Sequence, residues 1–378
     1  MNARDEKYAV TAAQRQKITA PALDYRPPRV AGVPPKIGLI GCGGITKSHL
    51  TAYRDAGYDV VGLTDIQPER AEERRKEFYP DATIYDTHQE LLADPAITVV
   101  DVATHPAPRA ALVRDALATG KHVLSQKPFV VDLEIGCELA DLADQHGVHL
   151  AVNQNGRWAP HVSYMRQAIT EGLIGDVTSI STTVAWNHNW TKDTPFNDIP
   201  HLLLYDFAIH WFDMISCYMT GRSARRVFAS ARQLSGQEAK PPFGASVVIE
   251  FDDALATMHF DANARFGPRD QTLILGNRGT LLSQGPDLGT QTVTLTTDEG
   301  EATPDLTGSW FPDGFDGSMS ELLVAIEQER PANNNARDNL NSLALAFAAM
   351  ASTDIGQPIE VGSVSRMHDS WLTYRVEI

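Results

Sequence analysis

The stretch that decides the fold of this chain is KIGLIGCGGIT, residues 36–46. A short apolar run leads directly into a glycine-rich turn, and a helical pattern follows. Gly41 and Gly43 permit a tight turn and a close approach of the backbone to a pyrophosphate, which the amides and dipole of a helix N-terminus bind. Glycine-rich turns between a strand and a helix are common, and Thr46 stands where the dinucleotide-binding pattern has Gly or Ala. A purely structural turn is therefore the alternative to a dinucleotide site.

Asp65, at the end of the second apolar run, favours the dinucleotide interpretation. A carboxylate there can accept a hydrogen bond from the ribose 2′-hydroxyl of NAD, and it would repel the 2′-phosphate of NADP. The sequence therefore predicts NAD. Arg70 keeps NADP open as the minority alternative, because an arginine near this position can bind a phosphate, stack on adenine or pair with Asp65.

The pattern of apolar runs predicts an α/β fold with two domains. Residues 36–155 alternate continuous apolar runs with helical stretches, which is typical of parallel βαβ units buried on both faces. We expect them to form an NAD-binding Rossmann domain, a doubly wound parallel sheet. Residues 156–378 hold longer β-rich runs, and predict a C-terminal α/β domain for substrate binding and oligomerisation, with a large, mostly antiparallel open sheet. Its helices are expected near 200–219, 317–328 and 335–352.

Residues 1–35 differ from both domains. Five prolines between residues 21 and 35 disfavour helix interiors and central strands. We predict an extended arm, with a disordered tail as the alternative. Leu23, Tyr25 and Val30 favour an arm that docks on another surface.

Composition excludes several classes of protein. The 48 acidic side chains exceed the 32 basic ones, and the formal charge of −16 repels phosphate backbones and anionic lipids. We therefore expect neither a nucleic-acid partner nor a membrane. Cys42, Cys137 and Cys217 form no CxxC pair, which indicates no disulfide framework, no thiolate metal site and a reducing compartment. With no apolar signal core in the first 30 residues, the expected location is the cytoplasm.

Lys127 follows the fifth apolar run, in the segment GKHVLSQKP. The carboxyl ends of parallel strands are where such sheets bind ligands. We expect the Lys-Pro step to direct this amine into the crevice. A solvated surface lysine is the alternative.

The apolar helix expected at 200–219 carries Asp206, His210 and Asp213 at i, i+4 and i+7. Burying these ionisable groups without a purpose would be costly, so we expect a catalytic role. An imidazole titrates near neutral pH, and a neighbouring carboxylate would orient it as a base. The alternatives are a wet domain boundary with an ordinary i, i+4 pair, and a metal site, for which no third ligand at zinc-like spacing is present. We expect no metal.

Together these segments resemble the glucose-fructose oxidoreductase, inositol dehydrogenase and rhizopine catabolism (Gfo/Idh/MocA) family over about residues 36–362. The resemblance is carried by GCGGIT, AT-x-P at 103–106, GKHVLSQKP, NQNGRW at 153–158, EGLIGDV at 171–177, the Asp206-x-x-x-His210 helix and STDIGQPIEV. It implies that Lys127 holds the substrate and handles a proton, and that His210 is the base. Three positions depart from the pattern. Gln126 replaces the more usual Glu, Arg109 stands where many relatives have His, and Ala208 replaces a frequent Gly.

The expected cofactor contacts are Gly41, Gly43, Gly44, Ile45, Asp65, Arg70, Thr104, His105, Pro106, Gln126, Lys127, Asn155, Arg157 and Trp158. The expected substrate contacts are Lys127, Arg157, Asn187, His188, Trp190, Asp206 and His210. Arg157 could instead pair with an acidic neighbour, and the segment 186–192 could instead pack at the domain boundary.

Three functions stay open on the sequence. The first is an NAD-dependent dehydrogenase of a sugar, cyclitol or sugar derivative, with His210 as base aided by Asp206 and Lys127. The second is an NAD-dependent glycosidase that oxidises a hydroxyl transiently, eliminates the glycoside and returns the hydride. The third is a non-enzymatic NAD-responsive protein, which these three residues argue against. The resemblance also implies a homodimer or homotetramer with a small carbohydrate as its substrate.

Overall fold

The computed structural model describes residues 15–372 and contains two sheets. The first sheet has six parallel strands in the order β3-β2-β1-β4-β5-β6, as expected of a doubly wound Rossmann domain. Its two central strands are buried along their whole length, because helices cover both faces. The strands are β1 (Ile37–Ile40), β2 (Val60–Thr64), β3 (Thr83–Ile84), β4 (Val99–Val102), β5 (His122–Gln126) and β6 (Leu150–Asn153).

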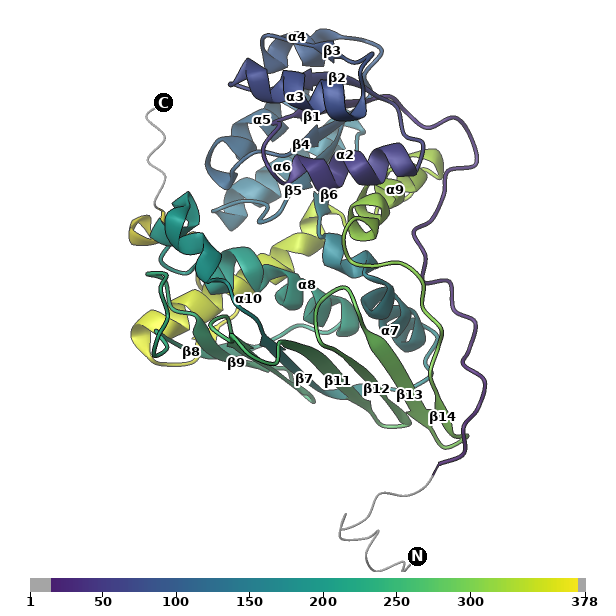
Figure 1. Cartoon of the computed structure of the whole chain (residues 1–378), viewed down its shortest axis with the longest axis vertical. Coiled ribbons are helices and arrows are strands. Elements are labelled where there is room, and N and C mark those ends of the chain that lie inside the picture. The colour runs from purple at the N-terminus through teal and green to yellow at the C-terminus, as the bar shows by residue number, and fades with distance from the viewer. Residues whose placement is uncertain (1–14, 373–378) are drawn as a thin grey trace, which may run out of the picture.

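Five helices alternate with these strands and confirm the predicted βαβ units (Figure 1). They are α2 (Thr46–Asp55), α3 (Pro68–Phe78), α4 (His88–Ala93), α5 (Pro106–Ala118) and α6 (Leu133–His146). The short helix η1 (Asn155–Trp158) and α7 (Pro160–Thr170) lead to the second sheet.

The second sheet has nine strands in the order β14-β13-β12-β11-β7-β10-β9-β8-β15. Every pairing is antiparallel except that of β10 with β7, so the prediction of a mostly antiparallel sheet is confirmed. Buried and more exposed positions alternate along its strands, as they do when a sheet buries one face. The strands are β7 (Val177–Ala185), β8 (Arg226–Arg232), β9 (Gly244–Glu250), β10 (Leu255–Asp261), β11 (Arg269–Gly276), β12 (Gly279–Gly285), β13 (Thr292–Thr297), β14 (Glu301–Ala302) and β15 (Ile359–Glu360).

Helices α7, α8 and α10 lie between this sheet and the first domain (Figure 1). The single helix expected at 200–219 is wrong in detail, because a π-helical turn (Leu203–Phe207) precedes α8 (Ile209–Tyr218). The other two expected helices are α9 (Asp313–Glu327) and α10 (Ala336–Ile355). The remaining short helices are η2 (Asn189–Asp193), η3 (Pro195–Asp198) and η5 (Asp369–Trp371).

Helix α9 joins the two domains. It comes late in the chain, yet it packs on α2 of the first domain (Figure 1). Its apolar residues Phe315, Met319 and Leu322 belong to the same buried cluster as Leu39 of β1. One core therefore spans a boundary that the sequence places near residue 155.

Residues 15–35 are the described part of the proposed arm. They run as an extended segment from the second sheet to β1 of the same chain (Figure 1). Lys17 bridges to Glu301 of β14. Arg29 forms a two-pronged ion pair with Asp316 of α9, with N–O distances of 3.0 and 2.6 Å. Glu327 accepts hydrogen bonds from two arm amides, those of residues 31 and 32. The part of the arm expected at 1–14 lies outside the described residues.

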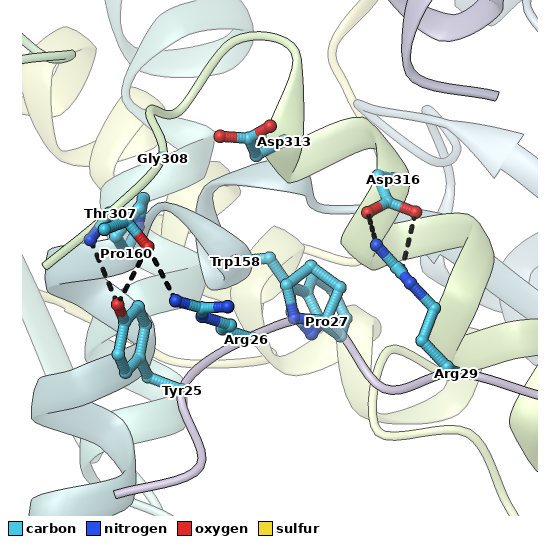
Figure 2. Close-up of a pocket in the computed structure, with 10 residues that line it drawn as sticks. All are labelled: Tyr25, Arg26, Pro27, Arg29, Trp158, Pro160, Thr307, Gly308, Asp313 and Asp316. Carbon is cyan, nitrogen blue, oxygen red and sulfur yellow. Dashed lines mark hydrogen bonds and ion pairs between the residues drawn. The ribbon is translucent and has the colours of Figure 1, made fainter. Parts of the chain in front are cut away.

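The arm encloses one side of a cavity of about 390 Å³. Figure 2 shows Tyr25, Arg26 and Pro27 on the arm side, and Trp158 and Asp313 on the other. Tyr25 and Arg26 both bond to Thr307 at one end of this cavity, and Arg29 pairs with Asp316 at the other, so the arm is held at both ends. Within residues 15–372, no helix is both long and apolar enough to span a membrane.

Candidate active site

The glycine-rich turn after β1 leaves open space where a dinucleotide would lie. Gly41 has φ +92°, and a Cβ there would lie 2.9 Å from the carbonyl oxygen of Ala103. Only glycine avoids that clash and adopts that backbone at no cost. A Cβ on Gly43 or Gly44 would meet nothing within 4 Å. The backbone of the turn is therefore open on the side of the α2 N-terminus.

The N-terminus of α2 is electrostatically suited to a pyrophosphate. Its N-cap residue Ile45 makes no side-chain cap, and its first turn carries no acidic residue. The amides at the N-terminus of a helix carry a partial positive charge. The Thr46 hydroxyl donates to the Gly43 carbonyl at 2.6 Å, which closes the turn beneath these amides. The turn therefore fits a dinucleotide phosphate group.

Asp65 holds the turn itself. Its Oδ2 accepts from the amide of Cys42 at 2.6 Å, and its Oδ1 accepts from the amide of Gln67 at 2.8 Å. Each carboxylate oxygen can accept a second bond, so a ribose contact stays compatible with this geometry. Arg70 is exposed at the start of α3.

Arg74 of α3 contacts the glycine-rich turn, and the sequence motifs did not identify it. Its side chain is 7% exposed, its Nε donates to Thr46 Oγ1 at 3.2 Å, and its Nη2 donates to the Gly43 carbonyl at 3.3 Å. The signal was available, because Ala71, Arg74 and Phe78 lie at i, i+3 and i+7 on the buried face of α3. An arginine on an apolar stripe needs buried acceptors.

Lys127 comes directly after β5, as predicted, and it meets Asp206 across the domain boundary. Its Nζ lies 3.3 Å from Asp206 Oδ1 and donates to the Asp206 carbonyl at 2.8 Å. The two side chains are only 16% and 17% exposed. The structure therefore brings together two of the three predicted catalytic residues as a shielded ion pair.

His210 lies close to this pair. Burial and the positive charge of Lys127 lower its pKa well below the usual value, so the ring is neutral at pH 7. Its Nδ1 is buried with no hydrogen-bond partner among the described residues. The ring packs edge-on against Trp310, with centroids 5.2 Å apart. The carboxylate expected to orient this ring, that of Asp206, faces Lys127 instead, because the π-helical turn alters the i, i+4 alignment.

The third residue of the expected stripe, Asp213, is separate from this cluster. It forms a buried two-pronged ion pair with Arg157, with N–O distances of 2.6 and 2.7 Å. Arg157 also donates to the carbonyl of Asn333, and Ser342 donates to Asp213. Of the roles considered for Arg157, the structure supports pairing with an acidic neighbour.

Arg109, which departs from the family pattern, supports the backbone around Lys127. It is 1% exposed and donates to the carbonyls of Thr104 and Pro128. Pro106 is the first residue of α5, the helix that carries Arg109. Burial, and then the charge of Arg109, lower the pKa of His105. Arg109 thus ties the loop after β4 to the Lys-Pro step after β5.

Asn155 and Trp158, both in the segment at 153–158, have different surroundings. Asn155 Oδ1 accepts from the indole of Trp310 at 2.7 Å, which fixes a ring beside His210. Trp158 is 3% exposed and packs so closely on α9 that a Cβ on Gly317 would lie 2.1 Å from it. Asn155 therefore supports the site, whereas Trp158 packs against α9 and the cavity of Figure 2.

The predicted substrate loop lies beside the π-helical turn. The ring of His188 lies 4.2 Å from that of Phe207, and its Nε2 accepts from the Trp186 indole at 2.8 Å. Burial lowers the pKa of His188 to about 3. Asn187 Oδ1 accepts from Asn189 at 2.9 Å. Trp190 is 56% exposed and offers an open aromatic face.

Two family models match parts of this chain. The family model "Oxidoreductase family, NAD-binding Rossmann fold" matches residues 35–154, and the "GFO/IDH/MocA C-terminal domain" matches residues 162–282. A D-apiose dehydrogenase of Paraburkholderia graminis is 26% identical over 358 residues, covering 87% of this chain and 90% of its own. An inositol 2-dehydrogenase of Gluconacetobacter diazotrophicus is 24% identical over 335 residues, with coverages of 86% and 96%.

A solved structure shows the same fold. An oxidoreductase from Agrobacterium radiobacter in complex with NAD⁺, L-tartaric acid and magnesium superposes with a TM-score of 0.78 at 20% identity, covering 86% of this chain and 98% of that one. Taken with the two family models and the glycine-rich turn, this similarity means that the chain belongs to the Gfo/Idh/MocA family of oxidoreductases, with an NAD-binding Rossmann domain.

Proposed function

We propose that this chain is an NAD-dependent dehydrogenase that oxidises a secondary hydroxyl of an uncharged sugar, cyclitol or sugar derivative. The observation that carries the proposal is the ammonium of Lys127, held by Asp206 beside the neutral ring of His210. These groups lie at the carboxyl end of β5, the edge of the sheet where ligands bind in such folds.

Each residue has one task in this proposal. When NAD is bound, it supplies the acceptor for the hydride. His210 takes the hydroxyl proton, since its ring is neutral and its buried Nδ1 has no hydrogen-bond partner among the described residues. Lys127 donates a hydrogen bond to the same oxygen and stabilises the negative charge that develops there. Asp206 positions Lys127 through the ion pair.

The charges around the site favour an uncharged substrate. Asp206 compensates the charge of Lys127, and His188 is neutral because of its lowered pKa. The two nearby arginines are also engaged, since Arg157 pairs with Asp213 and Arg109 donates to two carbonyls. An anionic substrate would have to compete for groups that are already bonded, and buried charges do not release their partners cheaply.

The named relatives support this substrate class. Two of them are a D-apiose dehydrogenase and an inositol 2-dehydrogenase, and apiose and inositol are an uncharged sugar and an uncharged cyclitol. One solved structure of the same fold holds tartaric acid instead. The exposed face of Trp190 and the polar groups beside it suit a polyol, which presents C–H faces as well as hydroxyls.

The test is NMR of the purified chain with NAD and pairs of compounds, each a neutral sugar or cyclitol beside its sugar acid, together with glycosides. An oxidised neutral product that rises in step with NADH is the expected result. Released sugar with NAD unconsumed would make the protein a glycosidase. Preference for the acid member of each pair would overturn the uncharged substrate class.

A further inference from the structure

A buried polar cluster lies beneath the glycine-rich turn and reaches the backbone of Lys127. His49 of α2 is its centre. The His49 Nδ1 lies 2.7 Å from Asp101 Oδ2, and its Nε2 lies 2.9 Å from Gln126 Nε2 and 3.2 Å from Asn153 Nδ2. His49, Asp101 and Asn153 are 0% exposed, and Gln126 is 5% exposed. None of the sequence motifs singled out His49 or Asp101.

One backbone amide determines which end of the Gln126 side chain faces His49. The Lys127 N–H donates to Gln126 Oε1 at 2.7 Å, which fixes the orientation of the side-chain amide. The NH₂ group of Gln126 therefore faces His49. Because that group can only donate, His49 Nε2 accepts the hydrogen bond and carries no proton. The proton of the neutral ring then lies on Nδ1, which donates to Asp101.

Tyr53 completes the donor set on Asp101. Its hydroxyl donates to Asp101 Oδ2 at 2.7 Å. Burial and the neighbouring carboxylate raise the pKa of Tyr53 well above its ordinary value, so the phenol remains a donor. Asp101 Oδ2 thus receives two hydrogen bonds, while Oδ1 is buried with no hydrogen-bond partner among the described residues.

We propose that His49 is a positioning residue for Lys127. Its Nδ1-protonated ring transmits the orientation set by Asp101 through Gln126 to the Lys127 backbone. This inference rests on the proposed function for Lys127. It also explains why this chain has Gln at position 126. A glutamate would turn an oxygen instead of an NH₂ group toward the lone pair of His49 Nε2, and that contact would need an additional proton on the carboxyl or on the ring.

The cluster also connects the cofactor end of the site to the chemical end. His49 lies one turn after Thr46 on α2, the helix whose N-terminus faces the expected pyrophosphate. Gln126 ends β5, and Asn153 ends β6. The ring of His49 therefore links α2 to the ends of β5 and β6, the strands that precede Lys127 and Asn155.

The first experiment reads the tautomer of His49 and needs no substrate. In the ¹⁵N-histidine-labelled chain at pH 7.5 with NAD bound, we expect an unprotonated Nε2 and a protonated Nδ1. In the Gln126→Glu variant, which removes the NH₂ donor to Nε2, we expect the Nε2 resonance to change. A proton on Nε2 in the unaltered chain would overturn the proposal.

The second experiment measures the effect on Lys127. His49→Leu and Gln126→Leu should each shift the Lys127 backbone amide resonance and lower kcat at least tenfold, while KM for NAD changes less than twofold. The double variant should be no worse than either single one. His49→Gln, whose amide oxygen can accept in place of Nε2, should restore most of kcat. His161→Gln is the matched control, since this second buried histidine lies on α7 away from the cluster.

The two readouts separate failure of this inference from failure of the proposed function. If the amide of Lys127 shifts in both leucine variants but no panel compound is oxidised by the unaltered chain, His49 positions Lys127 and the proposed function is wrong. Suppose instead that the unaltered chain oxidises a panel compound. His49 then has no positioning role if both leucine variants leave kcat and the Lys127 resonance unchanged. The same conclusion follows if the effects of the two single variants on kcat multiply in the double variant.

Discussion

Lys127 and Asp206 come from different domains and meet as an ion pair, with Nζ 3.3 Å from Oδ1 and 2.8 Å from the Asp206 carbonyl oxygen. The lysine follows a strand of the first sheet, and the aspartate lies in a π-helical turn above the second. Docking of the two domains therefore brings this ion pair together.

We expect Lys127→Met to lower kcat by about 10²–10³-fold, the usual effect of removing one donor to a developing oxyanion. Asp206→Asn should lower kcat less, because the carbonyl contact to Lys127 remains. Steady-state kinetics of the single and double variants check this. Since the two residues act as a unit, the effects should not multiply, and a double variant that loses the full product of both effects would contradict the pairing.

Cofactor choice should depend on the charge of Asp65. Asp65→Asn keeps an oxygen that can accept from the Cys42 amide but removes the negative charge. We expect the ratio of kcat/KM for NAD over NADP to fall at least tenfold, about 1.4 kcal/mol. Adding Arg70→Ala should reverse much of the gain for NADP if Arg70 contacts the 2′-phosphate. An unchanged ratio in Asp65→Asn would place the cofactor ribose elsewhere.

Arg74 should affect NAD binding through the turn rather than through direct contact. Arg74→Met keeps the buried stem and removes the donors to Thr46 and Gly43. Each bond from a charged donor is worth roughly 1.5–3 kcal/mol, so we expect Kd for NAD, measured by calorimetry, to rise at least tenfold. Arg75→Met is the matched control, because the neighbouring arginine pairs with Glu72 on the solvent side of α3. An equal rise in Kd for NAD in the two variants would show that the hydrogen bonds of Arg74 to the turn do not contribute to NAD binding.

Asp270 should make the chain less stable as pH rises. Burial in the second sheet raises the pKa of this carboxyl to about 7, whereas in the unfolded chain it ionises near 3.8. Between those values the folded state binds more protons than the unfolded state, so this group's contribution to the free energy of unfolding falls with rising pH. The fall is about 1.4 kcal/mol per pH unit, roughly 4 kcal/mol at most.

Denaturant unfolding at pH 4.5, 6 and 7.5 checks this prediction with Asp270→Asn, which cannot ionise. The variant should gain stability relative to the unaltered chain as pH rises, and the gain should level off above pH 7. The difference between the two chains cancels the titration of every group they share. Parallel stability curves would show that the carboxyl at position 270 ionises normally in the folded chain.

The arm should contribute to stability chiefly through Arg29. Arg29 reaches Asp316, whose side chain is 11% exposed, whereas Lys17 reaches Glu301 at the surface. Exposed ion pairs contribute about 0–1 kcal/mol, so Lys17→Ala should leave the melting temperature nearly unchanged. Arg29→Ala should lower it by several degrees, because it leaves the Asp316 carboxylate partly buried with one donor, Tyr58. Equal effects would show that this arm contact is no more than a surface pair.

Much of the first domain could be predicted from the sequence. The glycines at 41 and 43 and the apolar run before them determine the strand, the turn and the helix that follows, because these are preferences of neighbouring residues. The position of Lys127 was predictable for a related reason, since parallel strands all present their carboxyl ends at one edge.

The partners of the charged residues could not be predicted in this way. Spacing placed Asp206, His210 and Asp213 on one helical stripe, yet the three have different surroundings. A π-helical turn inserted before α8 changes the alignment of Asp206 with His210. Nothing in the local sequence indicates which strand end or which arginine will lie opposite each carboxylate.

The sequence by itself determined the order of strands and helices, the dinucleotide turn and the residue types available for catalysis, because these depend on backbone preference and apolar periodicity along the chain. Only the tertiary structure decided that Asp206 pairs with Lys127, that Arg157 is bonded to Asp213, and that His49 reaches Gln126. Such pairings join residues far apart in the chain. They depend on which surfaces are buried against each other, and a buried charge or polar group takes whatever partner that packing supplies.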